Sequence, residues 1–589
     1  HGDKTITIPT DHLAPSNTGN GSDGSITFER SSNGIKILPT LFGNNASSWM
    51  GKKVLTDDVR LGHLKKVGIT YMRFPGGNSS NNYFWDGNIP TSTKTDNNYN
   101  PVSGTDNAWR LGLNDFLNLC DTLGNEPVMC VNASYARYGN TTTPLTTAAH
   151  YAAEFVRYVN ITKGKKVKYW EIGNENYGPW QAGYLVEGDT IDGAKYATIA
   201  KVFADSMKAA DPSIKVGAVA VEVDGEKSGG YNWWNQKMMP NCIEKVDFWI
   251  AHQYFVYDNS DWNNITVNEI LSSTHLIKES IDNIEASVEK YTSYPGNHLP
   301  TAMTEYNLRG GTKEVAQVSA LFIAECLGEF IKNQYGLVML WDIQNGTKKA
   351  GTDGPGGDHG FYSWNDPVLP NGTPRPSFFV YYYAQQYLGH LSSNITIVGD
   401  SIKGYSSNDA KGNVGMVIIN QKNSGQSVKL QSSDDQVGNY YWHSIHAISK
   451  TEKKFFINGE TNNTYSEGGP EAYEQIKAYA ISNSALGTID LPANSVNFVL
   501  FQPQLATNTS TKKTEDINII RSDKRIFVVQ GIQNTSSISV YDASGKLFLN
   551  KKVNNQDIIN LNGVTSGIYF IEIRDQSNAS LYSKKIHLQ

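Results

Sequence analysis

The 589-residue chain has few charged side chains for its length. Asp, Glu, Lys and Arg make up 18% of it, and 51 basic against 57 acidic residues give a formal net charge of −6. So few basic residues offer no stripe that could neutralise a nucleic-acid backbone and no patch for an anionic membrane surface. We therefore expect no nucleic acid and no lipid surface as the main partner.

Several other common features are missing. The four cysteines form no C-x-x-C pair, which excludes the usual zinc and thioredoxin-type motifs, and Cys120 and Cys326 fall on apolar helical faces, so we expect buried free thiols. No run of 18 apolar residues is present, so we expect no membrane-spanning segment. No G-x-G-x-x-G follows the first expected strand. We expect no cofactor and no metal ion.

Uncharged polar and aromatic residues are abundant instead. The chain has 53 Gly, 32 Tyr and 12 Trp, and it is rich in Asn, Ser and Thr. Aromatic rings can lie against the apolar face of a sugar while amides bond its hydroxyl groups. This composition favours a neutral, ring-shaped polar ligand.

Short apolar runs alternate with helical periodicity between residues 35 and 390. The runs that we expect to be strands are 35–42, 68–74, 126–132, 167–173, 215–220, 246–252, 301–305 and 336–341. Eight repeated strand–helix units predict an α/β fold, a closed (β/α)8 or TIM barrel. A doubly wound open sheet is the structural alternative.

The flanking segments predict further domains. Alternating patterns over 391–503 indicate a β-sandwich, which the polar N-terminal segment 1–34 is expected to join. A Thr/Asn/Ser/Lys stretch at 504–516 is typical of a linker. Residues 517–589 predict a small all-β domain of short strands.

Two glutamates follow strands that face each other across such a barrel. Glu175 follows the fourth strand and Glu305 ends the seventh, at the end of the barrel where active sites gather. Retaining glycoside hydrolysis needs two carboxyl groups about 5–5.5 Å apart, one a proton donor and one a nucleophile. Glu175 and Glu305 are therefore the predicted catalytic pair.

Other side chains at the same strand ends are candidates for holding a substrate. Asn174 can bond a sugar 2-hydroxyl, Tyr254 can bond the nucleophile, and Trp341 can stack under a sugar ring. A structural ion pair is the alternative role for an arginine at this place, and a satisfied core side chain for a histidine. The predicted substrate-binding residues are Arg73, Asn78, Asn132, Asn174, Trp180, His252, Tyr254 and Trp341.

Several motifs carry a family resemblance. R-F-P-G-G-N at 73–78, P-V-M-C-V-N at 127–132, G-N-E at 173–175 with G-P-W-Q at 178–181, and A-D-P-S-I at 210–214 resemble family-51 α-L-arabinofuranosidases and related endoglucanases. These are members of the superfamily of retaining (β/α)8 glycosidases. The resemblance covers about the first 390 residues and implies Glu175 as acid/base and Glu305 as nucleophile. The chain departs from the family's D-E-W-N with T-E-Y-N at 304–307.

The C-terminal unit has a resemblance of its own. S-V-Y-D at 539–542, G-K at 545–546, S-G-I-Y-F at 566–570 and K-K-I at 584–586 are similar to the type IX secretion sorting domains of Bacteroidetes. This resemblance implies a secreted or cell-surface protein whose partners are the secretion and surface-attachment machinery. His1 in place of Met fits an exported chain whose leader has been removed.

The resulting hypothesis is a secreted retaining glycoside hydrolase that acts on plant or algal polysaccharide, of α-L-arabinofuranosidase type. An endo-β-1,4-glucanase or xylanase of the same superfamily is one alternative. A non-catalytic carbohydrate-binding surface protein is another, but loss of one carboxylate would be expected of it, and both are present.

Overall fold

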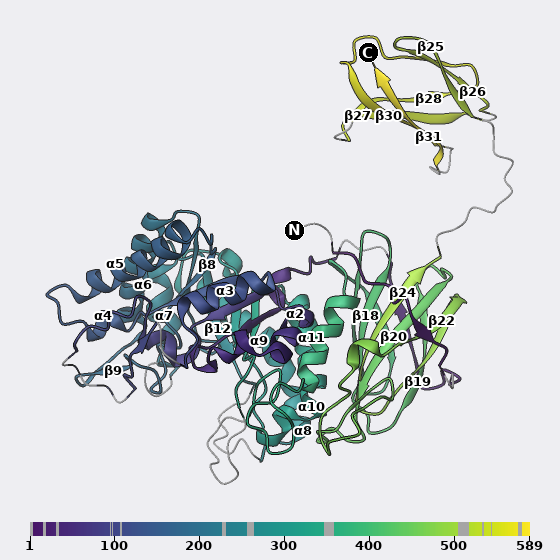
Figure 1. Cartoon of the computed structure of the whole chain (residues 1–589). Coiled ribbons are helices and arrows are strands. Elements are labelled where there is room, and N and C mark those ends of the chain that lie inside the picture. The colour runs from purple at the N-terminus through teal and green to yellow at the C-terminus, as the bar shows by residue number, and fades with distance from the viewer. Residues whose placement is uncertain are drawn as a thin grey trace. The chain divides into compact units, whose positions relative to one another are not determined.

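The computed structural model describes residues 4–15, 19–30, 34–92, 94, 96, 98–105, 109–226, 231–255, 264–346, 358–504, 517–532, 535–542, 545–574 and 580–588. Two compact units divide the chain, His1–Gln504 and Leu505–Gln589 (Figure 1). Apart from Gln504, the predicted linker 504–516 lies outside the described residues. The predicted domain limits remain a proposal.

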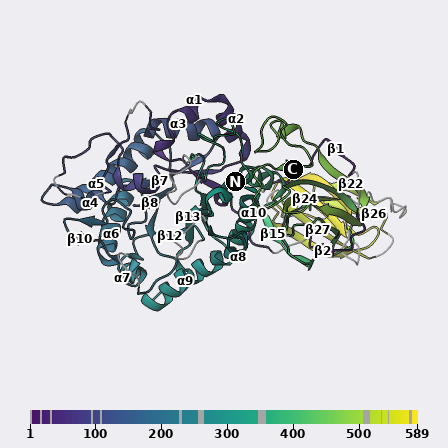
Figure 2. The same ribbon diagram turned by 90° about the horizontal axis from the view of Figure 1, so that it is seen from below.

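Eight parallel strands close into a barrel in the first unit, as predicted. Each strand pairs with the next along the chain, and the last pairs with the first. Figure 2 shows the strands inside a ring of helices. The strands are β3 (Gly43–Asn45), β4 (Tyr71–Phe74), β7 (Glu126–Val131), β8 (Tyr169–Ile172), β11 (Lys215–Val219), β12 (Phe248–Gln253), β13 (Thr301–Tyr306) and β14 (Leu337–Leu340).

The first barrel strand differs from the predicted one. Residues 35–42 were expected to form it, but Pro39–Leu41 is a short 3-10 turn and the strand is β3, which has no apolar side chain. Leu41 and Phe42 are buried in the main core outside that strand. The apolar run 35–42 therefore indicated residues that pack in the core, not a strand of the barrel. The strand itself has polar residues because the barrel interior at β3 is polar.

Helices follow most of the strands, and their ends have local causes. The Asp57 side chain accepts hydrogen bonds from the backbone of Val59 and Arg60 and so caps α2. The helices of the barrel are α1 (Lys53–Thr56), α2 (Asp58–Val67), α3 (Leu113–Leu123), α4 (Tyr135–Tyr138), α5 (Pro144–Val156), α6 (Gly193–Ala210), α7 (Trp234–Cys242), α8 (Val267–Ser272), α9 (Leu276–Tyr291), α10 (Gln317–Lys332) and α11 (Pro376–Tyr387).

Helix α10 joins the barrel to the sandwich. It is buried along nearly its whole length because it packs between the two (Figure 2). The Gln317 side chain donates to the carbonyls of Ile445 and Asn494 at 3.1 and 2.8 Å. Glu325, 1% exposed, pairs with Lys403 across the same contact. The four cysteines are buried and free, as expected.

The sandwich consists of two sheets packed over an apolar core. The first has the order β1 (His12–Leu13), β22 (Ala478–Ser484), β20 (Gly438–His446), β24 (Ser495–Pro503), β18 (Val414–Asn420), β17 (Ile402–Asn408) and β15 (Leu391–Ser393), with β21 (Phe456–Ile457) on β20. The second has the order β16 (Ile395–Gly399), β2 (Gly24–Phe28), β19 (Gln426–Ser432) and β23 (Leu486–Leu491). Both sheets thus include a strand from the N-terminal segment.

The second unit has a core of its own, with Val529, Ile538 and Ile571 at its centre. One of its sheets has the order β25 (Asn518–Asp523), β26 (Ile526–Gln530) and β29 (Ile558–Asn560). The other has the order β28 (Leu547–Val553), β27 (Ser536–Asp542), β30 (Gly567–Arg574) and β31 (Ser580–Leu588). Over the described residues of both units, no helix is long and apolar enough to span a membrane.

Candidate active site

The guanidinium of Arg73 on β4 is the hub of a polar barrel interior. Its Nε donates to Glu171 Oε2, its Nη1 to Glu305 Oε1 and its Nη2 to Asn174 Oδ1, each at 2.8 Å. The side chain is 0% exposed. A buried cation needs such partners, and the planar fork of arginine can reach several at once. Arg73 therefore positions Glu305 and Asn174 rather than facing open solvent.

Two members of this network were not among the predicted site residues. Asn45 on β3 accepts from Arg73 Nη1 at 3.0 Å and donates to the carbonyl of Thr304 at 2.9 Å. Glu171 on β8 is 0% exposed and also accepts from Cys130 Sγ at 3.4 Å. The available signal was a carboxylate inside an apolar strand, which in a barrel requires a buried cation as partner.

Glu305, at the end of β13, is held at both oxygens. Oε1 accepts from Arg73 and Oε2 accepts from the Tyr254 hydroxyl at 3.0 Å. The Arg309 guanidinium lies 4.5 Å from the centre of the Tyr254 ring. Burial and the charge of Glu305 raise the pKa of Tyr254 well above its usual value, so the hydroxyl stays protonated and donates. The carboxylate is thus fixed in one orientation.

Glu175 follows β8 in a left-handed backbone conformation, with φ 42°. Its Oε2 accepts from Trp180 Nε1 at 2.7 Å and Gln181 Nε2 at 2.9 Å, and its Oε1 bonds His252 Nδ1 at 3.0 Å. Burial would raise the pKa of Glu175, but the hydrogen bond and charge of His252, with the Trp180 bond, hold it at about 2. The resting carboxyl group is therefore ionised.

His252, on β12, lies between the two glutamates. Its Nδ1 is 3.0 Å from Glu175 Oε1 and 3.7 Å from Glu305 Oε2, and its Nε2 bonds Thr304 Oγ1 at 3.1 Å. Burial lowers the pKa of His252, but the negative charges of Glu305 and Glu175 outweigh it and raise the pKa above its usual value. At a pH between the pKa values of Glu175 and His252, the proton of this pair therefore lies on His252.

The two carboxylates are close enough to act on one bond. One oxygen of each, together with a His252 nitrogen, forms a set whose atoms lie within 4.8 Å of one another. Three ligand atoms so arranged are also suited to a divalent metal ion. The prediction that the protein needs no metal stays a prediction.

The loop that carries Glu175 is braced by Asn81, another residue that the sequence did not single out. Its Nδ2 donates to the carbonyl of Asn174 at 2.6 Å and to Gln181 Oε1 at 2.9 Å. Its Oδ1 accepts from the backbone of Asn174 and the side chain of Asn176. Asn81 is 0% exposed, so these bonds hold the loop rigidly.

The remaining candidates lie around this centre. Asn78 Oδ1 accepts from the backbone of Ala182, and the Asn132 side chain bonds the backbones of Tyr83 and Tyr135. These two amides hold loops, and their role in substrate binding remains a prediction.

Two tryptophans border the site. Trp180 is 48% exposed beside Glu175. The ring of Trp341, after β14, is partly buried against Gly77, where a Cβ atom would lie 2.9 Å from it. Both rings remain candidates for stacking on a sugar.

A buried arginine that bonds two carboxylates, and a histidine between Glu175 and Glu305, lie at the carboxyl ends of the strands of a (β/α)8 barrel. This arrangement is suited to glycoside hydrolysis. Comparison with known proteins places the chain further. Residues 63–262 match the family model described as the Alpha-L-arabinofuranosidase 1 domain, and residues 514–589 match the Secretion system C-terminal sorting domain. Both predicted resemblances are confirmed, and the sorting domain indicates export.

Individual relatives agree with these matches. An intracellular exo-alpha-(1->5)-L-arabinofuranosidase of Acetivibrio thermocellus is 29% identical over 209 residues, 34% of this chain and 39% of that protein. A probable alpha-L-arabinofuranosidase C of Aspergillus niger is 26% identical over 309 residues, 48% of this chain and 58% of that protein. The chain thus matches about two to three fifths of the length of these curated relatives.

Solved structures share the fold. The alpha-L-arabinofuranosidase of Thermotoga maritima aligns with a TM-score of 0.59 and 16% identity, over 81% of this chain and 99% of that one. A family 44 xyloglucanase of Paenibacillus polymyxa aligns with a TM-score of 0.54 and 13% identity, over 82% and 99%. These likenesses confirm the barrel-and-sandwich architecture.

Proposed function

We propose that the protein is an exported retaining glycoside hydrolase of the α-L-arabinofuranosidase type. The observation that carries the proposal is the separation of Glu175 and Glu305, which bring one oxygen each within 4.8 Å. Retaining glycosidases place their carboxyl groups about 5–5.5 Å apart, whereas inverting enzymes need about 6.5–9.5 Å to admit a water molecule. The family match supports the type of enzyme.

Glu305 is the nucleophile in this mechanism. Arg73 and Tyr254 fix its carboxylate, and it attacks the anomeric carbon as the bond to the leaving oxygen breaks. A glycosyl ester forms at Glu305 while a proton passes from Glu175 to the leaving oxygen. We expect Asn174, whose Oδ1 accepts from Arg73, to bond the sugar 2-hydroxyl.

Glu175 needs a proton for the first step and must lack one for the second. We infer that His252 supplies it, because its Nδ1 lies 3.0 Å from Glu175 Oε1 and the neighbouring carboxylates raise the pKa of His252. After the leaving group departs, Glu175 is again a carboxylate. It takes a proton from the water that attacks the ester and returns that proton to His252, which restores the starting state. Its low resting pKa keeps Glu175 ionised, as this second role requires.

This proton placement predicts a pH profile. Because the pKa of His252 is raised above 6.5, the wild-type kcat/KM should fall as pH rises through that pKa, when the proton leaves the pair. The His252→Asn variant faces Glu175 with an amide that does not titrate. We expect its kcat/KM to drop by about 10²–10⁴-fold and its alkaline limb to move out of the neutral range. An unchanged alkaline limb in the variant would assign the limb to another group.

The type of substrate is tested by a hydrolysis panel. It contains 4-nitrophenyl α-L-arabinofuranoside, arabinan, xylan, carboxymethylcellulose and an algal galactan, with product sizes read by chromatography. We expect arabinose from the arabinoside and arabinan, with the first-formed anomer retained in NMR spectra. Oligosaccharides from xylan or the glucan with a silent arabinoside would instead support an endo-glucanase or xylanase. No product from any substrate, with glycan binding intact, would support a non-catalytic surface protein.

We further propose plant or algal polysaccharide as the substrate and the secretion and surface-attachment machinery as partners of residues 514–589. The match of that segment to the sorting-domain model supports the second of these proposals.

A further inference from the structure

A recess lies in the sandwich and shares no residue with the candidate active site. It has a volume of about 560 Å³, within the range of ligand pockets. Strand β1, the segment 458–464 after β21 and the segment 470–479 that leads into β22 form its walls.

The backbone around the recess is held by two amide side chains. Asn458 accepts from the backbone of Ser444 at 2.8 Å and donates to the carbonyl of Lys477 at 2.9 Å. Asn462, 6% exposed, donates to the carbonyls of Glu467 and Gly469 at 2.9 and 3.2 Å. These bonds fix the shape of the recess before any ligand arrives, which lowers the entropy lost on binding.

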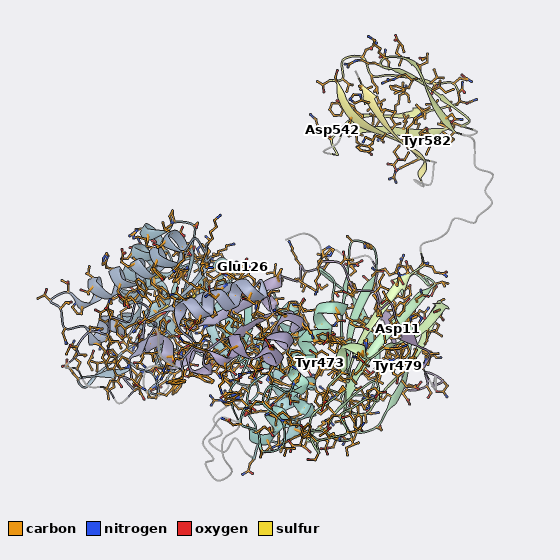
Figure 3. The ribbon with its side chains drawn as sticks, viewed as in Figure 1. Asp11, Glu126, Tyr473, Tyr479, Asp542 and Tyr582 are labelled. Carbon is orange, nitrogen blue, oxygen red and sulfur yellow. The ribbon has the colours of Figure 1, made fainter. Side chains whose placement is uncertain are left out.

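One wall is apolar and partly aromatic. Leu13 of β1 is the parallel neighbour of Tyr479 of β22, and Leu13 is 50% exposed. The Tyr479 ring is held by its hydroxyl, which donates to the carbonyl of Asn458 at 3.0 Å, and by Trp442, whose ring centre is 5.6 Å away. Figure 3 shows Tyr479 beside Asp11 at this edge. A ring fixed in this way can receive the apolar face of a sugar.

The rim is polar, and its side chains have unused hydrogen-bonding capacity. All the lining residues are described, and the side chains at five rim positions are exposed without a hydrogen-bond partner in the described part of the chain. These are Glu460, Asn463, Thr464, Glu471 and Gln475. Among lining residues the cation is Lys477, which pairs with Asp11 at 2.9 Å. The carboxylates of Glu460 and Glu471, beside a lysine whose charge is already paired, disfavour an anionic ligand.

We propose that this recess binds an uncharged oligosaccharide, as a second attachment point for a neutral polysaccharide. A sugar chain combines an apolar face with a rim of hydroxyl groups, and the recess offers an apolar wall and a rim of free amide, hydroxyl and carboxylate groups. The proposal goes beyond hydrolysis, because it needs no chemistry at Glu175 or Glu305.

The test is affinity electrophoresis in gels that contain arabinan, arabinoxylan or a β-glucan, with polygalacturonate as the anionic counterpart. Every protein carries Glu305→Gln so that the polymer stays intact. The recess variants are Asn463→Ala/Gln475→Ala and Leu13→Asp, which change exposed side chains. The matched control is Val398→Asp, an exposed apolar position on β16 of the other sheet; Val398 is 63% exposed and Leu13 50%.

We expect at least one neutral polymer to retard the parent and the control, and both recess variants to bind at least about tenfold more weakly. Polygalacturonate should retard none of them. The proposal is overturned if no neutral polymer retards the parent, if the recess variants bind as the parent does, or if polygalacturonate binds through the recess.

When the recess substitutions are made in the protein that keeps Glu305, these variants should hydrolyse 4-nitrophenyl α-L-arabinofuranoside at the wild-type rate. If neither the wild type nor the recess variants hydrolyse this substrate, the proposed function fails. The electrophoresis still tests whether the recess binds a neutral polymer.

Discussion

Replacing Glu305 by Gly should reduce turnover on the order of 10⁵-fold, because it removes the group that forms the covalent intermediate. Azide added to this variant should attack the anomeric carbon from the side that Glu305 occupied, opposite the leaving group. The product should be a glycosyl azide of inverted configuration. The measurement is the rate of aryl-glycoside hydrolysis with and without azide, and the configuration of the product by NMR.

Glu175→Ala is the matched variant, and its pattern should differ. An activated 4-nitrophenyl leaving group needs little protonation, so formation of the ester should remain fast while its hydrolysis slows and kcat falls. Unactivated arabino-oligosaccharides should lose about 10²–10⁴-fold in kcat/KM. Azide should rescue this variant with retained configuration. Identical azide products from the two variants would refute the assignment of the two roles.

Arg73→Met should destabilise the barrel by about 3–5 kcal/mol, because it leaves the buried Glu171 without a partner and removes a cation from Glu305. The midpoint of urea unfolding should shift at constant slope, and activity should be lost as well. Arg73→Lys should rescue little, since one ammonium group cannot replace a fork that reaches Glu171, Glu305 and Asn174.

The double variant Arg73→Met/Glu171→Leu separates stability from activity. It removes a buried carboxylate together with its partner, so part of the lost stability should return. Activity should not return, because Glu305 still lacks the donor to its Oε1. Recovery of activity in the double variant would show that Arg73 serves only to neutralise Glu171.

The order of strands and helices was accessible from the sequence because each unit repeats an apolar run and a helical period. Strand β3 was missed because its residues, including Asn44 and Asn45, are polar and pair inside the barrel. Apolar periodicity reports burial against a hydrophobic neighbour, and it cannot report a polar interior. The same limitation hid Glu171, which stands within an apolar strand.

The candidate site was predictable as a set of positions but not as a set of charges. Glu175 and Glu305 stand at the predicted strand ends, yet their catalytic roles are a proposal. The low pKa of Glu175 depends on donors from Trp180 and His252 that meet it only in the folded barrel. Such a convergence follows from three-dimensional distances, which local patterns do not contain.

The place of strand β2 in its sheet determines when that sheet can form during synthesis of the chain. The strand lies in the middle of a sheet between β16 and β19, which are parts of the chain made only after the whole barrel. Strand β2 leaves the ribosome early and must therefore wait, unpaired, until the last barrel helix has been synthesised. Closing that sheet joins the two ends of the segment that forms the barrel, so the sandwich cannot be completed before the barrel segment has been synthesised.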